Sequence, residues 1–329
     1  MTAERKAAMN TAERLIKTLN FEKMPEGGAF AETFFPWTLT VDRWREEGLP
    51  EKFTAEYLYP KAEDRSRRYF NDLMTEPVYE YEQFFGLDGI KRMSFRIPFK
   101  CFDEKVLEET EEFILKLDED GWTRKYYKNR DLIKDIQPVI RDEEDWKILK
   151  EKIHYELEQY CTEEKIEEIY GKYVQGHKRG DFSIRFRASG FFWTSRELMG
   201  VEEQLLAFYE MPELLHEIND FILEMYLKYF ERIFSLIQPE VILFEEDLSG
   251  ANGPMISPEM FDEFVGSYYK KLAPFLKEKG VKNVFVDTDG DFRRLIPNFL
   301  QAGIDGFLPM DVNAGMDIVE VRREFPKVK

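Results

Sequence analysis

The feature that most constrains the fold is a repeated order of apolar run, acidic loop and amphipathic segment in the C-terminal half of the chain. Strand-like segments at 241–244, 281–286 and 305–309, of which the first is continuously apolar, are each followed by a polar loop and a segment with helical spacing. Short continuous apolar runs are typical of strands buried on both faces, and strands that alternate with helices indicate a parallel sheet. The pattern therefore predicts β/α architecture.

The helices of this half have ordinary boundary signals. Leu214–Leu236 carries apolar residues at intervals of three and four, which predicts one long helix that ends at Gln238-Pro239. Ser257-Pro258-Glu259 predicts the start of a second helix, which runs to about Lys279, and shorter helices are expected at 292–301 and 316–324. Because the units are closely spaced, we expect a (β/α)8 TIM barrel, which needs about 250 residues.

The N-terminal half predicts additions to this barrel within a single domain, residues 1–329. Residues 105–129 read as an inserted antiparallel hairpin with its turn at Asp118–Gly121, and 142–173 as charged, solvated helix. Further expectations are a helix at 11–20, a weak first strand at 27–32, and a helix from Asp42 that Gly48 ends. The last barrel strand has barely begun at Lys329, so we expect a truncated C-terminal end.

Charge and residue counts exclude several classes of protein. The net charge of -18 argues against nucleic-acid binding and against binding to anionic membranes. Cys101 and Cys161 lie too far apart for a Cys-x-x-Cys motif, and the chain has only three His. With no apolar run of membrane-spanning length and no signal core, we expect a cytoplasmic protein.

Acidic residues follow the predicted strands, where the carboxyl ends of barrel strands place functional groups. Converging carboxylates bind a divalent cation, act as general acid and base, or hydrogen-bond a substrate. Some of them serve equally well as helix caps. The strand-end rule points to six acids, which are Glu245, Glu246, Asp247, Asp287, Asp289 and Asp311. The catalytic candidates among them are Glu246, Asp247, Asp287 and Asp289, and Asp311 is a candidate for contact with substrate.

A second group of candidates lies on either side of Glu246 and Asp247 in the sequence. Arg185 and Arg187 fall on one face of a predicted strand, which suits either recognition of a substrate carboxylate or a salt bridge to the acidic strand ends. Trp193, after a glycine, is either a stacking wall for a ligand or part of the core. Asn252 lies in the polar loop that follows the acids.

Several segments resemble the uroporphyrinogen decarboxylase superfamily, most strongly after residue 180. They are Arg196-Glu-Leu-Met-Gly200, Glu246-Asp247 ahead of Asn252-Gly-Pro-Met-Ile-Ser-Pro-Glu-Met-Phe261, and Gly303-Ile-Asp-Gly306 with Ala314-Gly-Met-Asp317. The resemblance implies a (β/α)8 barrel with a deep cleft. It also implies one of two activities: decarboxylation of uroporphyrinogen, or transfer of methyl groups to and from a corrinoid.

Two departures from the family pattern bear on the activity. The decarboxylases carry an N-terminal Arg-Gln-Ala-Gly-Arg motif whose arginines bind substrate carboxylates, whereas residues 30–36 here contain no arginine. The zinc-dependent methyltransferases carry His-x-Cys where this chain has Asp287 and Asp289. Carboxylates suit a harder ion or a weaker zinc site.

The resemblance and the acids together predict methyl transfer between a small methylated substrate and a corrinoid protein. Glu246, Asp287 and Asp289 would then polarise the substrate or hold a divalent metal such as zinc. One alternative is decarboxylation of uroporphyrinogen or a similar carboxylated compound without a cofactor, with Arg185 and Arg187 binding carboxylates. Another is a non-catalytic relative that binds a tetrapyrrole or another ligand. Because family decarboxylases are dimers, the resemblance also implies a homodimer.

Overall fold

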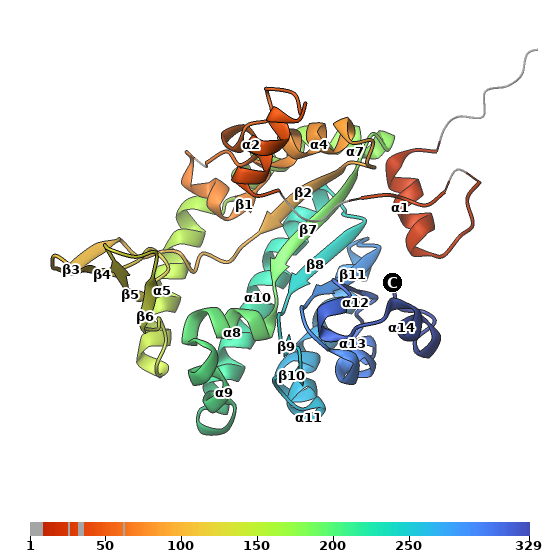
Figure 1. The fold of residues 1–329 in the computed structure, drawn as a ribbon. Helices are drawn as coiled ribbons and strands as arrows, with labels where there is room; N and C mark the ends of the chain where they lie inside the picture. The colour runs from red at the N-terminus through yellow and green to blue at the C-terminus, as the bar shows by residue number, and fades with distance from the viewer. Residues whose placement is uncertain (1–8, 26, 32–35, 62) are drawn as a thin grey trace, which may run out of the picture.

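The computed structural model describes residues 9–25, 27–31, 36–61 and 63–329. Its main sheet has six strands in the order β1-β2-β7-β8-β11-β12 (Figure 1). Neighbouring strands from β2 to β12 run parallel, and β1 is antiparallel to β2. The strands are β1 Phe70–Asn71, β2 Ile90–Phe95, β7 Ser183–Ser189, β8 Val241–Glu245, β11 Asn283–Asp287 and β12 Gly306–Leu308.

The register of the sheet aligns the carboxyl ends of its central strands. Asp287 at the end of β11 is opposite Glu245 at the end of β8, and Glu245 is opposite Ser189 at the end of β7. Because side chains alternate along a strand, these aligned residues point to the same side of the sheet. The predicted gathering of acids at one edge is therefore correct for the last residues of the strands.

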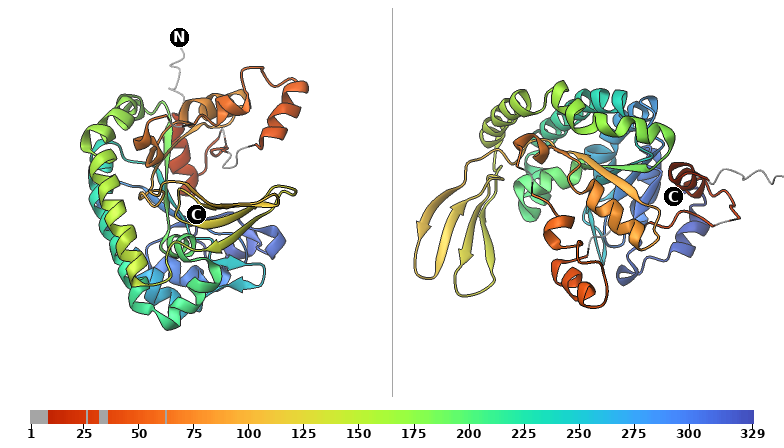
Figure 2. Two further views of the ribbon diagram at one scale, coloured as in Figure 1. Left: turned by 90° about the vertical axis from the view of Figure 1, so that its left-hand side faces the viewer. Right: turned by 90° about the horizontal axis from the view of Figure 1, so that it is seen from above.

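Helices cover the outer face of this sheet (Figure 2). The long helix α10 Pro212–Leu236 buries one side against outward-pointing strand residues such as Ile242 and Phe244. Helices α6 Glu163–Tyr170, α8 Phe191–Met199, α9 Val201–Glu210 and α12 Ser267–Glu278 contact α10. The other helices that follow β1 are α4 Thr75–Phe84, α5 Glu143–Tyr160, α7 Val174–Arg179, α11 Pro258–Phe261, α13 Ile296–Gln301 and α14 Ile318–Glu324.

The inner face of the sheet has its own small apolar cluster. Val241, Leu243 and Phe285 point inward and pack against Leu15 and Leu19 of α1 Thr11–Leu19. Helix α1 thus covers part of the inner face. Toward the carboxyl ends of β7, β8 and β11, the inner face carries charged residues instead.

The described strands form an open sheet, so the expected closed barrel is not confirmed while the mixed α/β architecture is. One edge ends at the two-residue antiparallel strand β1. At the other edge, the Lys329 amide donates to the Asp305 carbonyl at 3.0 Å, and the Lys329 carbonyl accepts from the Phe307 amide at 3.2 Å. Lys329 therefore continues the hydrogen bonding of the sheet beside β12.

The predicted hairpin at 105–129 is larger than the sequence indicated. It is a four-stranded antiparallel sheet, here called the arm, of β3 Lys105–Glu109, β4 Phe113–Leu117, β5 Thr123–Tyr127 and β6 Ile133–Gln137. The alternating segment 106–117 is two strands, because the Thr110 hydroxyl accepts hydrogen bonds from the next turn and reverses the chain. The turn at 118–121 is as predicted, with Gly121 at φ +83°. The arm projects from the rest of the molecule (Figures 1 and 2).

Most other predicted elements are present. Helices near the N-terminus are α1, α2 Thr38–Glu46 and α3 Ala55–Leu58. Residues 27–31 contain no strand, against the weak prediction there, and residue 32 lies outside the described residues. Helix α5 is not simply solvated, since Trp146, Leu149 and Ile153 are buried. No helix in the described ranges is long and apolar enough to cross a membrane.

Candidate functional site

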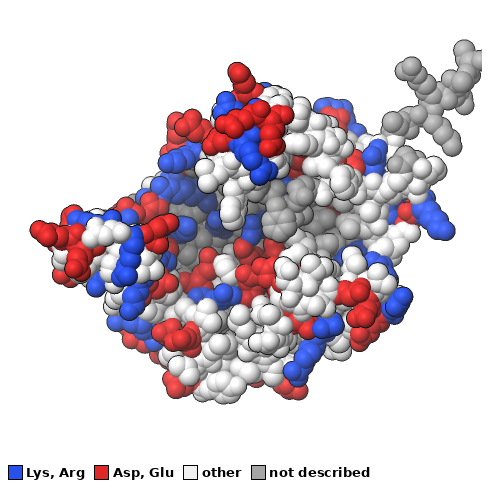
Figure 3. All heavy atoms as spheres, in the orientation of Figure 1, with Lys and Arg blue, Asp and Glu red and all other residues white. Residues whose placement is uncertain are grey.

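The carboxyl ends of β7, β8 and β11 bring Arg187, Glu245 and Asp287 together on the inner face. The Arg187 guanidinium contacts the Glu245 carboxylate at 2.5 Å (Nη2 to Oε1). Asp287 is the register partner of Glu245 and is influenced electrostatically by both. Figure 3 shows Asp and Glu side chains gathered at the centre of this face, with Lys and Arg beside them.

Asp287 has a perturbed carboxyl group. Burial raises its pKa to about 6, the Arg187 guanidinium acts in the opposite direction, and the nearby carboxylates of Glu245 and Asp247 add to the rise. A carboxyl group with a pKa near neutrality both donates and accepts protons at working pH. Asp287 is therefore the strongest candidate for acid–base chemistry among the predicted acids.

The two neighbouring predicted acids, Asp247 and Asp289, lie beside Asp287. The Asp247 carboxylate accepts a hydrogen bond from the Asp289 amide at 3.2 Å, and the Asp247 amide donates to the Asp287 carbonyl at 3.3 Å. Asp247 has φ +45°, which is uncommon for a residue with a side chain. The Arg196 guanidinium donates to the Asp247 carbonyl at 2.7 Å and so holds this conformation. Burial first, then Asp247, raises the pKa of Asp289.

The predicted residues Asp311 and Asn252 lie farther along the same edge. The Asp311 carboxylate accepts from the Asn313 and Ala314 amides and from the Gly290 amide, so it caps one turn and tethers the loop after β11. Asn252 is exposed at the tip of the small hairpin β9 Ser249–Gly250 and β10 Gly253–Pro254. Neither residue therefore joins the Arg187–Glu245–Asp287 group through a contact of its side chain.

Glu246 does not share a cleft with Asp287 and Asp289, which corrects the predicted site. It is completely buried on the outer side of the sheet, where it accepts hydrogen bonds from the amides of 191–193 at the start of α8, at 2.8–3.1 Å. The Tyr269 hydroxyl also donates to it at 2.5 Å. Burial raises its pKa to about 7, while these hydrogen bonds act in the opposite direction. Glu246 therefore has a structural role as the cap of α8.

The residues present do not fit the metal that the family resemblance implies. Zinc sites use three or four protein ligands, and without Glu246 the proposed set is reduced to Asp287 and Asp289. Over the whole described part of the chain, no group of three or more His, Cys, Asp or Glu side chains is placed to hold a metal ion. We therefore derive no chemical step through a metal.

The two predicted arginines have different environments. Arg187 forms the salt bridge to an acidic strand end that was one of its two predicted roles. Arg185 lies deeper, opposite Arg92 of β2, and within the described residues no hydrogen bond or ion pair holds its guanidinium. Burial first, then the nearby Arg92 and Arg187 cations, lowers its pKa to about 9. Since it is still partly accessible, Arg185 is available to an anion.

A cavity of about 290 Å³, here called the strand-end cavity, opens at the carboxyl ends of β2, β7 and β8. Its walls include the apolar side chains of Ile97, Phe99 and Trp193, so the predicted Trp193 does line a ligand-sized space. Arg196 lies over the Trp193 ring at 5.2 Å and fixes its position. The charged lining residues are Arg68, Arg96, Lys100, Arg187, Glu197 and Glu245.

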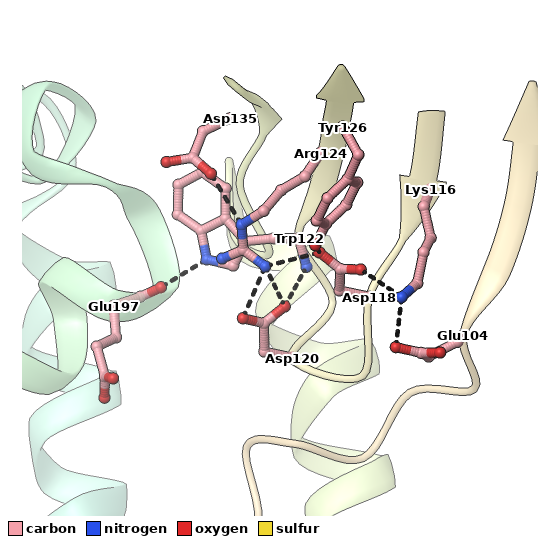
Figure 4. A network of polar contacts seen from close by, with 9 residues as sticks. All are labelled: Glu104, Lys116, Asp118, Asp120, Trp122, Arg124, Tyr126, Asp135 and Glu197. Atoms are coloured by element: carbon pink, nitrogen blue, oxygen red, sulfur yellow. Dashed lines mark hydrogen bonds and ion pairs between the residues drawn. The ribbon is translucent and has the colours of Figure 1, made fainter. Parts of the chain in front are cut away.

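A second cavity of about 300 Å³ lies between the arm and α8 and shares Trp193, Glu197 and Lys100 with the first. The Trp122 indole donates to the Glu197 carbonyl at 2.7 Å and fastens the arm to α8 (Figure 4). Within the arm, the Arg124 guanidinium donates hydrogen bonds to the carboxylates of Asp118, Asp120 and Asp135. The arm thus forms an ordered wall beside the site.

Sequence reasoning missed several residues of the strand-end cavity. Glu245 is not among the missed residues, because it ends an apolar run and the strand-end rule points to it. Arg96 and Lys100 follow β2, a strand that was not predicted, and Glu197 lies within a helix. Nothing in the local pattern marks these three residues.

Comparisons with known proteins bear on the family and the fold. Residues 189–328 match the family model described as uroporphyrinogen decarboxylase (URO-D). A solved methyltransferase from Methanosarcina mazei is similar in structure, with a TM-score of 0.52 and 15% identity over 91% of this chain and 75% of that chain. At that identity the likeness shows the fold alone. No curated protein matches the sequence. The resemblance to the uroporphyrinogen decarboxylase superfamily is confirmed, in the region where it was expected to be strongest.

Proposed function

We propose that this chain is a uroporphyrinogen decarboxylase-like enzyme that transfers a methyl group between a small methylated substrate and a corrinoid on a partner protein. The observation that carries the proposal is the position of Asp287, with its raised pKa, beside the Arg187–Glu245 ion pair that lines the strand-end cavity. The URO-D family match and the methyltransferase-like fold support the same choice.

The chemistry of demethylation requires a proton at the leaving atom. When the bond from the methyl carbon to an ether oxygen or amine nitrogen breaks, its electron pair stays on that atom. Asp287, with a pKa of about 6, then delivers the proton as general acid. The corrinoid, when its partner protein presents it, supplies the nucleophile that takes the methyl group. The Arg187 guanidinium holds Glu245 and tunes the acidity of Asp287.

The size of the cavity favours a small substrate. Small-molecule sites are typically about 300–1,000 Å³. The strand-end cavity, at about 290 Å³, is at the lower limit of this range. Uroporphyrinogen has four pyrrole rings and eight carboxylates, which is far more than such a volume holds. We therefore place methyl transfer from a small molecule ahead of tetrapyrrole decarboxylation.

Decarboxylation remains a second candidate because of one observation. The Arg185 guanidinium is largely enclosed, close to Arg92 and Arg187, and has no hydrogen-bond partner among the described residues. Enclosed guanidinium groups bind carboxylates strongly and with defined geometry. A carboxylated substrate that reaches Arg185 would fit this arrangement.

The proposal is tested with purified protein, cob(I)alamin and a panel of small methyl ethers and methylamines, some of which carry a carboxylate, by following the visible absorbance of the corrinoid. We expect methyl transfer to cob(I)alamin from at least one member of the panel. The rate should be lower by about 100-fold or more in Asp287→Asn. The exposed Asp220→Asn is the matched control and should retain the rate. Release of CO2 from uroporphyrinogen by the metal-free protein, without methyl transfer, would instead establish the decarboxylase. Binding of a tetrapyrrole with neither activity would establish the non-catalytic relative.

A further inference from the structure

We propose that the strand-end cavity selects a small carboxylic acid as its substrate, and that Arg96 and Lys100 are the residues that recognise the carboxylate. The inference deepens the proposed function, since it names the substrate class of the same site. It rests on the charge and geometry of the cavity, and its test does not depend on methyl transfer.

The charge of the cavity is opposite to that of the molecule. The chain carries a net charge of -18, yet this cavity is lined by four cations and only two carboxylates. An anion that enters would therefore be attracted locally, against the repulsion of the acidic surface. A cavity with this inversion of sign is suited to an anionic ligand and unsuited to a methylated cation.

Two of the four cations already have partners. Arg187 contacts Glu245 at 2.5 Å, and Arg68 contacts Glu119 at 3.0 Å. Arg96 and Lys100 differ, because in the part of the chain that the structure describes no hydrogen bond or ion pair engages either side chain. Their counter-charge in the cavity is the carboxylate of Glu197, which both influence electrostatically.

The backbone holds these two cations at the cavity. The Arg96 amide donates to the Tyr69 carbonyl at 2.8 Å, and the Phe99 amide donates to the Ile97 carbonyl at 2.7 Å. Tyr69 and Ile97 are buried, so the segment 96–100 is anchored while its charged ends remain exposed. A guanidinium and an ammonium beside apolar walls attract a carboxylate more strongly than they would in open water.

The same cavity extends to the ion pair that lies beside Asp287. Its lining includes Arg96 and Lys100 on one side and the Arg187–Glu245 pair on the other. A small molecule whose carboxylate is held by Arg96 and Lys100 therefore extends toward Glu245 and its register partner Asp287. Recognition of the carboxylate would thus orient the other end of the substrate for reaction.

The test uses three nearly isosteric probes: succinate, succinamate and succinamide, which carry two, one and no negative charges. Isothermal titration of the purified protein at low ionic strength should show binding that weakens in this order and weakens further with added salt. Arg96→Gln and Lys100→Gln should each weaken succinate binding about 5- to 10-fold. The exposed residues in Arg294→Gln and Lys282→Gln are the matched controls and should leave the affinity unchanged.

Three results would overturn the inference. They are equal affinity for succinate and succinamide, no detectable binding of any of the three probes, or equal losses in the control variants. The proposed function fails separately, because a protein that binds succinate through Arg96 and Lys100 but transfers no methyl group would retain this inference and lose the reaction.

Discussion

Glu245 and Glu246 are neighbours in the sequence and have opposite roles in the structure. Glu245 points to the inner face and contacts Arg187, whereas Glu246 points outward and caps α8. Alternation along the strand forces this separation. The apolar run before them did not reveal which of the two faces the cavity, because inner and outer residues of β8 are equally apolar.

The raised pKa of Asp287 predicts how the stability of the protein changes with pH. Its folded pKa, about 6, is above the ordinary value of 3.8, so the protonated form is favoured in the folded state. The stability that this group contributes is complete below about pH 4 and is lost as pH rises through 6. We therefore expect Asp287→Asn to gain stability relative to the natural protein between pH 4.5 and pH 7.5.

Urea denaturation of both proteins at the two pH values measures this difference. Asp220→Asn, which alters an exposed carboxylate, is the control. A difference in unfolding free energy between Asp287→Asn and the natural protein that is the same at both pH values would contradict the raised pKa.

The junction between β7 and α8 shows how one element depends on another. Helix α8 begins without a capping side chain of its own, and Glu246 from the loop after β8 accepts its first amides instead. This arrangement requires a residue without a side chain at Gly190. A Cβ atom there would lie 2.1 Å from the Glu246 carboxyl carbon.

Gly190→Ala should therefore destabilise the fold by about 3 kcal/mol, since neither the buried carboxylate nor the helix start has room to move. Gly250→Ala is the control, because a Cβ atom at that position would meet nothing within 4 Å and the backbone is not left-handed. Thermal or urea unfolding of the two variants provides the comparison. A loss below about 0.5 kcal/mol for Gly190→Ala would mean that Glu246 does not cap α8 in solution.

At the scale of the whole molecule, the N-terminal helix packs on strands that lie more than 200 residues away in the sequence. Leu15 and Leu19 of α1 contact the inner apolar residues of β8 and β11. The Arg14 guanidinium also pairs with Asp88 at 3.1 Å, just before β2. The helix therefore connects both halves of the sheet.

The double variant Leu15→Ala/Leu19→Ala should lower the free energy of unfolding by about 2–4 kcal/mol, because both leucines are partly buried against the sheet. Leu39→Ala, at a leucine that is 80% exposed, is the control and should have little effect. Chemical denaturation measures both. Equal stability of the double variant and the natural protein would show that α1 does not contribute to the core.

The sequence by itself determined the order of strands and helices in the C-terminal half, because apolar spacing and helix boundaries are local signals. The predicted helices at 214–236 and 258–279 and the strands at 241–244, 281–286 and 305–309 are all present within a few residues. The same signals identified the acids at strand ends as candidates. They also led us to expect a closed barrel, which the described strands do not form. Closure depends on contacts between the first and last strands, and local signals do not report those contacts.

Only the tertiary structure decided which charged residues meet. It placed Glu246 on the outer side of the sheet and Asp287 beside Arg187, and it brought Arg96 and Lys100, which follow an unpredicted strand, to the cavity that Arg187 lines. Burial and electrostatic neighbours, which set the pKa of Asp287, depend on chain segments far apart in sequence. For that reason the acidic strand ends were visible in the sequence, whereas the basic cavity beside them was not.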